Sequence, residues 1–300
     1  MTDVPEEVKA LVVEREDRRR ARDFQAADQL RDRVTALGYR IVDTATGSRV
    51  EVLEQAAPAR LRPSDVPSVL DQEPTADVSI QWLVQGWPED TLRGIAAFRR
   101  HQGSRTVQHV VVEASGSEIE WPEDVEVLAL EGDPGWGAGR NCGLKRAAGS
   151  VVVVVDGSVE ATGEVLGPIE QALADPTVGV CGPFGITTRD LRQFEESTGP
   201  EVDAIEGYLM AFRRKVLSRS GMFDDRFRFY RSADIEFSFR VKELGLRAVV
   251  VPVPVKRHEH RMWVNTPQAD RDRLSKRNFY RFLERFRGRM DLTVAGGQTD

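Results

Sequence analysis

The sequence predicts an α/β domain built on a mainly parallel sheet with helices on both faces. From Val78 onward, short apolar segments alternate with segments typical of helices. The apolar segments show no polar alternation, and residues 151–155 are five consecutive valines. Strands that are apolar throughout are typical of a parallel sheet buried on both faces. Ligands of such sheets bind at the carboxyl ends of the strands, so the residues that follow each strand are candidate site residues.

The strands and helices of this domain are expected in regular alternation. The expected strands are 78–84, 107–112, 125–130, 151–155, 178–181, 204–212 and 248–253. The expected helices are 89–101, 141–148, 163–174 and 235–244. This order predicts that Glu113, Asp156 and His258, each of which follows a strand, lie at one edge of the sheet.

The N-terminal residues predict a separate small module. Residues 4–37 have two apolar stripes at helical spacing, which predict a hairpin of two helices. Asp23 can cap the second helix, and Gly38 can end it in the left-handed conformation. Residues 41–42 and 50–53 flank a polar turn and predict a short β-hairpin.

Composition sets the domain boundaries. Residues 54–76 contain four prolines and are expected to be a partly extended linker. The chain therefore divides into a module at 1–53, the linker at 54–76, the main domain at 77–265, and a basic amphipathic helix with a tail at 266–300. That last helix could lie on a membrane surface or pack its aromatic side against the domain.

Bulk properties exclude several classes of protein. A net charge of −6 over 300 residues argues against a nucleic-acid binder along the whole chain. The two cysteines, Cys142 and Cys181, cannot form a disulfide framework or a zinc cluster. The N-terminus does not read as a signal peptide, and the longest apolar runs are too short to span a bilayer. We expect a cytoplasmic protein.

Asp156 ends the valine strand, where a carboxylate can bind a ribose hydroxyl or a metal ion that carries phosphate oxygens. The alternative is a cap for the turn at Gly157 and Ser158. His258 follows the last expected strand, and alternation on an extended segment puts His258 and His260 on one side. One of these imidazoles could complete a Mn²⁺-like site with Asp156.

Two further segments carry polar groups at helix starts. Residues 135–143 are rich in glycine and open a helix, so their backbone amides could face an anion, although a tight turn explains the glycines equally well. Their G-x-G-x-x-x-G spacing is one residue longer than the dinucleotide fingerprint. Asp234 lies in the first turn of the expected helix 235–244, where it could act as a general base or serve as an ordinary helix-start acid.

The order of these motifs resembles the family 2 glycosyltransferases with the GT-A fold, over about residues 77–286. The matching stretches are 136–143, 147–149, 151–156, 206–213, 221–224, 233–240, His258 and 278–286. The resemblance implies a nucleoside-diphosphate-sugar donor, a divalent metal (Mn²⁺ or Mg²⁺) and an acceptor hydroxyl.

The resemblance also implies roles for individual residues. Asp234 matches the family's general base, and Asp156 matches the first acid of its D-x-D motif. His258 matches a residue that touches metal or diphosphate in some relatives, which makes Asp156 and His258 the expected metal ligands. Glu113 stands where an acid recognises the base of the nucleotide. The expected nucleotide-binding set is Glu113, Gly137, Arg140, Asn141 and Asp156.

This sequence departs from the family pattern at two positions. Ser158 replaces the second acid of D-x-D, and Ala233 replaces the glutamate that usually precedes the base. Losing a carboxylate removes a strong oxygen ligand from a metal site. The expected function is an inverting, metal-assisted sugar transfer. The alternative is a non-catalytic nucleotide-sugar binder or scaffold with a degenerate D-x-D motif.

The N-terminal module has a resemblance of its own. Residues 10–52, with Ala21-Arg22-Asp23-Phe24 and Leu37-Gly38 among the matching stretches, are similar to the C-terminal segment of cysteinyl-tRNA synthetases, at their anticodon-binding end. A third hypothesis is therefore an RNA-associated protein that acts through this hairpin. A docking or homo-oligomerisation role fits the same residues.

Overall fold

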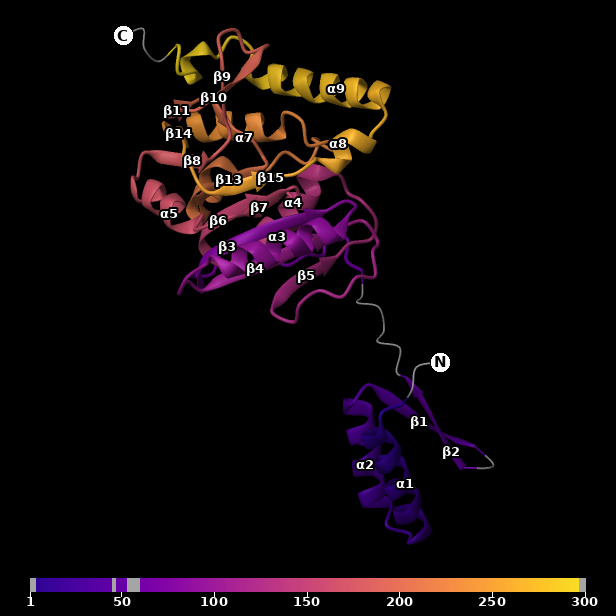
Figure 1. The fold of residues 1–300 in the computed structure, drawn as a ribbon. Helices are drawn as coiled ribbons and strands as arrows, with labels where there is room; N and C mark the ends of the chain where they lie inside the picture. The colour runs from indigo at the N-terminus through magenta and orange to yellow at the C-terminus, as the bar shows by residue number, and fades with distance from the viewer. Residues whose placement is uncertain (1–3, 45–46, 53–59, 297–300) are drawn as a thin grey trace. The chain divides into compact units, whose positions relative to one another are not determined.

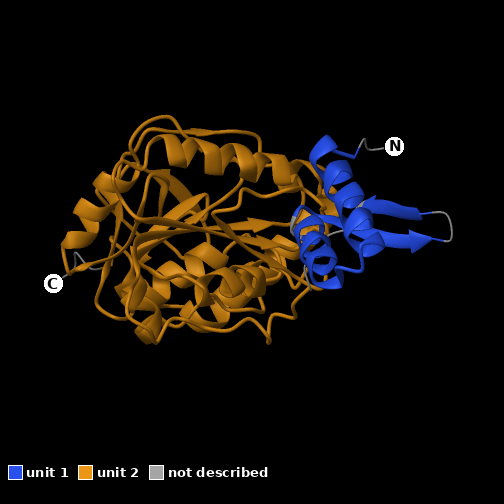
Figure 2. Cartoon of the chain, turned by 90° about the horizontal axis from the view of Figure 1, so that it is seen from below, with its two compact units in different colours: residues 1–59 blue, residues 60–300 orange. Residues whose placement is uncertain are grey.

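The computed structural model describes residues 4–44, 47–52 and 60–296. The chain forms two compact units, residues 1–59 and residues 60–300 (Figure 2). Part of the expected β-hairpin and linker, residues 53–59, lies outside the described residues.

The first unit is the expected helical hairpin followed by a β-hairpin. It consists of α1 (Glu6–Arg20), α2 (Phe24–Ala36) and the antiparallel strands β1 (Tyr39–Thr44) and β2 (Gly47–Val52). Asp23 caps α2 by accepting a hydrogen bond from the Ala26 N–H at 3.2 Å, and Gly38 has the positive φ that ends the helix. The Arg15 guanidinium in α1 donates to both oxygens of Asp43 in β1, at 2.8 and 3.0 Å. This bidentate pair fixes the β-hairpin to the helices.

The second unit is built on an eight-stranded sheet (Figure 1). In spatial order its strands are β11 (Glu201–Val202), β14 (Arg247–Val250), β8 (Val178–Gly182), β13 (Leu209–Arg213), β6 (Gly149–Val155), β3 (Ala76–Val84), β4 (Val107–Glu113) and β5 (Val125–Ala129). Strands β6, β3, β4 and β5 are mutually parallel, as are β14 and β8. Strand β13 is antiparallel to both β6 and β8, so the sheet is mixed but mainly parallel, as predicted.

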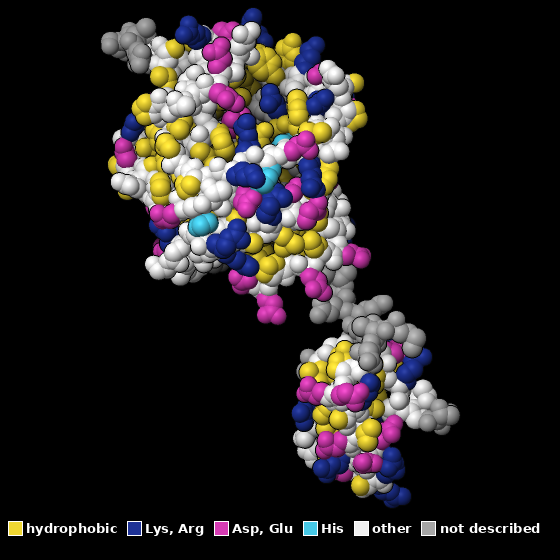
Figure 3. Space-filling view, viewed as in Figure 1, with side chains coloured by type: hydrophobic (Ala, Val, Ile, Leu, Met, Phe, Trp, Pro, Cys, Tyr) yellow, Lys and Arg dark blue, Asp and Glu magenta, His cyan; other side chains and the backbone are white. Residues whose placement is uncertain are grey.

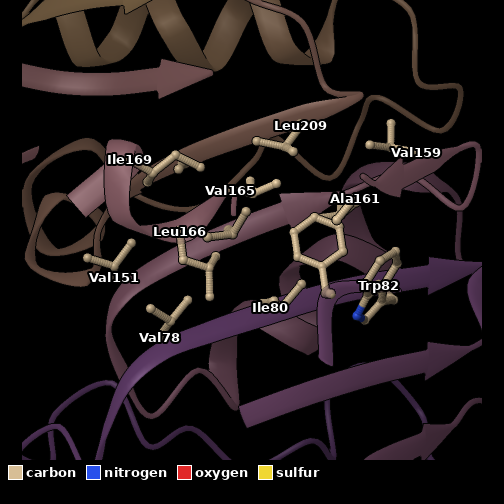
Figure 4. Close-up of a cluster of buried hydrophobic side chains, with 14 of the residues drawn as sticks. Val78, Ile80, Trp82, Val151, Val159, Ala161, Val165, Leu166, Ile169 and Leu209 are labelled. Carbon is tan, nitrogen blue, oxygen red and sulfur yellow. The ribbon is translucent and has the colours of Figure 1, made fainter. Parts of the chain in front are cut away.

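Helices cover both faces of this sheet. On one face, α3 (Pro88–Arg100) and α5 (Leu166–Ala174) pack on apolar residues such as Ile80, Trp82 and Val153 (Figure 4). On the other face, α4 (Trp136–Lys145), α6 (Leu217–Ser220) and α7 (Ala233–Lys242) pack on residues such as Val154 and Phe212. Because consecutive residues of β6 point to opposite faces, a strand buried on both must be apolar throughout, which the five valines are.

The remaining elements lie outside the eight-stranded sheet. They are β7 (Val159–Ala161), β9 (Gly185–Thr188), β10 (Phe194–Ser197), β12 (Ala204–Ile205), β15 (Val255–Arg257), α8 (Arg261–Asn265), α9 (Gln268–Phe286), η1 (Arg214–Val216) and η2 (Met290–Leu292). The aromatic side of α9 packs inward, since the rings of Phe282 and Phe286 lie 5.0 and 5.3 Å from that of Phe239 in α7. Among the described residues, no helix is both long and apolar enough to cross a membrane.

The structure corrects the expected linker. Residues 60–75 belong to the second unit and pack on it, rather than standing between two domains. Leu61 N–H donates to the Ala129 carbonyl at 2.7 Å, Val66 is buried, and Val69 N–H donates to the Lys145 carbonyl at 2.8 Å. The prolines of this segment therefore fit an extended chain that follows the domain surface.

Two expected elements also differ in a way that bears on the site. Helix α4 begins at Trp136 rather than Asn141, so most of the glycine-rich segment is helical. The single strand expected at 204–212 is broken into β12 and β13. The break lies at Glu206, Gly207 and Tyr208, and it turns these residues toward the carboxyl edge of the sheet.

Candidate active site

Two adjoining cavities lie beyond the carboxyl ends of β3 and β6. The first is lined by residues that follow β3, by residues 156–158 and by residues 259–262. The second is lined by residues 206–208, by residues 230–235 and by side chains of β9 and β10. Four residues line both cavities: Trp136, Asp156, Tyr230 and His260. Histidine and charged side chains of both signs gather on one face of this unit (Figure 3).

Asp156 lies at the junction of the two cavities, as the end of the valine strand predicted. Its Oδ1 accepts hydrogen bonds from the backbone N–H of Ser158, at 2.9 Å, and from the Ser158 hydroxyl. Its Oδ2 lies 3.5 Å from Nε2 of His260. Burial raises the pKa of this carboxyl, but the hydrogen bonds from His260 and Ser158 outweigh it and bring the pKa to about 2. Asp156 therefore carries its negative charge at neutral pH.

His260, rather than the expected His258, is the imidazole beside Asp156. Its Nδ1 accepts a hydrogen bond from the Trp263 N–H at 3.1 Å, which caps α8. In the neutral ring the proton is then on Nε2, the atom that faces Asp156. As arranged, His260 directs this N–H toward the Asp156 carboxylate.

His258 points to a different partner. Its Nε2 lies 2.7 Å from Oε2 of Glu160, in the strand β7 that pairs with β15. Alternation on an extended segment would have put both histidines on one side, but the chain enters α8 directly after His260. In this arrangement Glu160 engages the His258 imidazole, and the expectation that His258 joins Asp156 in a metal site stays a prediction.

Arg140 supplies a buried positive charge next to Asp156 in the first cavity. Its Nη1 donates to Oε1 of Gln81 at 2.7 Å and to the carbonyl of Val155 at 3.1 Å, and its guanidinium stacks on the Trp136 ring. Burial lowers the pKa of Arg140 to about 10, against the opposing effect of the Asp156 charge. At neutral pH the group remains a cation and favours negative charge in the cavity.

Two backbone amides at the glycine-rich start of α4 already have partners. The N–H groups of Trp136 and Gly137 donate to the carbonyls of Arg228 and Phe227, at 3.0 and 2.9 Å. A Cβ on Gly137 would lie 2.5 Å from the Asp224 carbonyl oxygen, so this glycine allows close backbone packing. Close packing therefore accounts for Gly137, and its expected nucleotide contact stays a prediction.

Asn141 and Glu113 are also engaged elsewhere. The Asn141 side chain donates to the Phe223 carbonyl at 2.7 Å. The Glu113 carboxylate accepts hydrogen bonds from Ser115 and Ser117, which close the loop after β4. Among the described residues that line the two cavities, neither Asn141 nor Glu113 is found. Both side chains have structural partners here, and their expected nucleotide contacts stay predictions.

Asp234 lines the second cavity at the start of α7. Its two oxygens accept hydrogen bonds from the N–H groups of Gly207, at 2.8 Å, and Ile235, at 2.9 Å. Burial raises its pKa in spite of these hydrogen bonds, which favour the charged form. A fixed carboxylate with a raised pKa is suited to accept a proton from a hydroxyl.

Glu206 is a member of the site that sequence reasoning missed. It is half-buried in the second cavity beside Asp234, and burial followed by the Asp234 charge raises its pKa to about 7. Its signal in the sequence was an acid followed by glycine inside an otherwise apolar run. That combination disfavours a continuous buried strand, and the structure breaks the strand there.

A metal ion at this site would depend on one carboxylate. Within the described part of the chain, no group of three or more His, Cys, Asp or Glu side chains is arranged to hold a metal ion. The ionised Asp156 lines both cavities. Ser158 stands where a second acid would be, and Nε2 of His260 faces Asp156. This donor set fits an ion such as Mg²⁺ or Mn²⁺ only where phosphate oxygens supply further ligands.

The mainly parallel sheet, the antiparallel β13 and the acidic cleft at the carboxyl edge define a GT-A fold. The structure of GalNAc-T7 with UDP, GalNAc and Mn²⁺ is similar to 70% of this chain and 48% of that one, at 15% identity and a TM-score of 0.56. A mannosyltransferase from Pyrobaculum calidifontis in complex with GDP-Man and Mn²⁺ is similar over 77% of this chain and 73% of that one, at 19% identity and a TM-score of 0.51. At these identities the likeness shows the fold.

The resemblance to the family 2 glycosyltransferases is confirmed, since residues 104–236 match the family described as glycosyl transferase family 2. Residues 1–50 match the cysteinyl-tRNA ligase anticodon binding domain. In the same region the chain is 42% identical over 48 residues to a cysteine–tRNA ligase from Caldicellulosiruptor saccharolyticus, which is 16% of this chain and 10% of that protein. It is 45% identical over 51 residues to the cysteine–tRNA ligase of Chlamydia trachomatis, which is 17% of this chain and 11% of that protein. The chain spans about a tenth of the length of these curated relatives.

Proposed function

We propose that residues 60–300 transfer a sugar from a nucleoside-diphosphate-sugar to an acceptor hydroxyl. The observation that carries the proposal is the pair of cavities with a shared wall, with Asp156 at their junction and Asp234 in the second. The match to the glycosyltransferase family and the GT-A fold support the same reaction. The donor occupies the first cavity and the acceptor the second.

In this mechanism Asp234 is the general base. The Gly207 and Ile235 N–H groups orient its carboxylate, and its raised pKa makes it a stronger proton acceptor than an exposed aspartate. As Asp234 takes the proton of the acceptor hydroxyl, the oxygen bonds to the anomeric carbon and the bond from that carbon to the diphosphate breaks. The electron pair leaves on the diphosphate. A single displacement of this kind inverts the anomeric configuration.

Two groups of the first cavity act on the departing diphosphate. Arg140 provides a fixed positive charge, and the Nε2–H of His260 is a hydrogen-bond donor at the junction. Asp156 would hold a divalent ion together with the phosphate oxygens, and such an ion would offset the charge on the diphosphate.

The test is donor hydrolysis and sugar transfer with UDP- and GDP-sugars, with and without Mn²⁺. Asp234→Asn should lower turnover by about 10²- to 10⁴-fold while the donor still binds. Glu196→Gln is the matched control, because it removes a carboxylate from an exposed position on the same cavity. Unchanged turnover in Asp234→Asn would refute the assignment of the base.

A second candidate is a nucleotide-sugar binder without catalysis. The observation that favours it is the loss of the second D-x-D acid, since Ser158 now donates its hydroxyl to Asp156. Calorimetry with the same donors separates the two functions. Saturable binding without turnover supports the binder, whereas turnover excludes it.

For the N-terminal module we propose an RNA contact, which rests on its match to the anticodon binding domain. The measurement is a gel shift of tRNA by the full chain and by a chain that lacks residues 1–59, at moderate salt where purely charge-driven binding weakens. An equal shift by both chains would contradict the proposal.

A further inference from the structure

A groove next to the first cavity is lined by two arginines that form no ion pair with an acid among the described residues. It is lined by Gln85, Asp133, Arg228, Phe229, Met262, Thr266, Leu274 and Arg277. Gln85 and Met262 also line the first cavity, so the two are adjacent. Arg228 comes from the loop before α7, and Arg277 comes from α9.

Helix α9 carries two further arginines near this groove, outside its lining, and one of them, Arg281, donates to the Arg226 carbonyl. Arg273, Arg277 and Arg281 are four residues apart, which places them in one row along the helix. Burial and then the charges of Arg281 and Arg273 lower the pKa of Arg277, and Arg228 contributes in the same direction. Like charges at this spacing destabilise a helix, so the row of arginines lowers the stability of α9 when no anion is bound.

Acids compensate only part of this charge. Arg273 pairs with Asp270 at 2.8 Å, but among the described residues no acid forms an ion pair with Arg228, Arg277 or Arg281. The carboxylate of Asp133, which also lines the groove, is engaged by the side chain of Gln85 and the N–H of Gly135, both at 2.8 Å. The groove therefore keeps an excess of positive charge.

Hydrogen bonds from α9 fix the position of the loop before α7, which carries Arg228. Asn278, fully buried in α9, donates to the carbonyls of Phe229 and Arg231 at 2.6 and 2.9 Å. Arg228 donates to the carbonyl of Asp133 at 3.3 Å. The loop that carries Arg228 is thus held next to the helix that carries Arg277, and both arginines line the groove.

We propose that this groove binds a phosphate group, with Arg228 and Arg277 as its contacts and Arg273 and Arg281 strengthening the positive potential. Guanidinium groups match phosphate oxygens in geometry and charge. The phosphate can belong to a soluble ligand or to a lipid headgroup. The proposal stands whether or not the neighbouring cavities transfer a sugar.

The test uses the full chain and two probes, in low salt with a chelator present. Calorimetry measures binding of inorganic pyrophosphate, and sedimentation measures binding to phosphatidylcholine vesicles with and without phosphatidylglycerol. Arg228→Gln/Arg277→Gln should weaken binding of at least one probe by about tenfold or more. The matched control is Arg219→Gln/Lys276→Gln, which removes the same charge from exposed positions outside the groove lining.

The outcomes separate the sources of phosphate. Pyrophosphate binding that depends on the two arginines identifies a soluble ligand, and vesicle binding with the same dependence identifies a headgroup. Asp156→Asn, a change in the first cavity, should not reproduce the loss of binding seen in Arg228→Gln/Arg277→Gln, which distinguishes the groove from that cavity. Equal losses in the groove variant and the control, or no binding of either probe, would overturn the proposal.

Discussion

The Glu206 carboxyl makes the stability of the second unit depend on pH. Its pKa rises from the usual 4.5 to about 7, first because of burial and then because of the Asp234 charge. The folded state therefore binds this proton more tightly than the unfolded chain. The stabilisation is fully present below pH 4.5 and is lost as the pH rises through about 7. Glu206→Gln, which cannot ionise, should remove this loss.

The size of the effect follows from the displaced pKa. At about 1.4 kcal/mol per pH unit, a change from 4.5 to about 7 corresponds to roughly 3 kcal/mol. Water reaches the half-buried carboxyl and screens it, so we expect an observed difference of about 1–2 kcal/mol. Between pH 5 and pH 8, the wild type should lose that much more unfolding free energy than Glu206→Gln.

Urea unfolding followed by tryptophan fluorescence measures this difference. All five tryptophans lie in residues 60–300, so the signal reports on the unit that contains Glu206. Glu195→Gln removes an exposed carboxylate from β10 that is not among the charges shifting the pKa of Glu206, and it should behave like the wild type. If Glu206→Gln lost as much stability as the wild type between the two pH values, the reasoning would be refuted.

Two further predictions concern packing. Gly149→Ala should destabilise the second unit by about 1–3 kcal/mol, because the new methyl group would overlap the backbone of Ser79 in the neighbouring strand; an unchanged urea midpoint would contradict this. Asn278→Ala should cost about 1–3 kcal/mol, since it leaves the carbonyls of Phe229 and Arg231 without their donor. The exposed Asn265→Ala is its control, and an equal effect of the two would show that the buried hydrogen bonds contribute nothing.

The sequence predicted the sheet well because burial on both faces leaves a simple pattern. Residues 151–155 have to be apolar at every position, and β6 is the central strand that they form. The expected linker was wrong for residues 60–75 because proline content describes an extended backbone and not what that backbone packs against. The contacts of Leu61 and Val66 depend on distant residues, which spacing along the chain does not reveal.

The site could be predicted in part, for a similar reason. Asp156 and Asp234 follow from their places at a strand end and a helix start, and both line the second cavity. Which of His258 and His260 faces Asp156 depends on where the extended segment ends. Alternation holds only within that segment, and α8 begins directly after His260. Glu206 was missed because the mostly apolar residues around it predicted one continuous strand at 204–212, whereas the chain forms two strands with Glu206 between them.

The wall shared by the two cavities makes their ligands interdependent. Tyr230 and His260 are in ring contact at 4.5 Å, and each faces both cavities. A ligand that moves either ring changes the shape of both binding sites at once, so occupancy of one alters the affinity of the other. Thermodynamic linkage requires that the influence be equal in both directions. The affinities of the two cavities would then be coupled through one pair of tilted rings in contact.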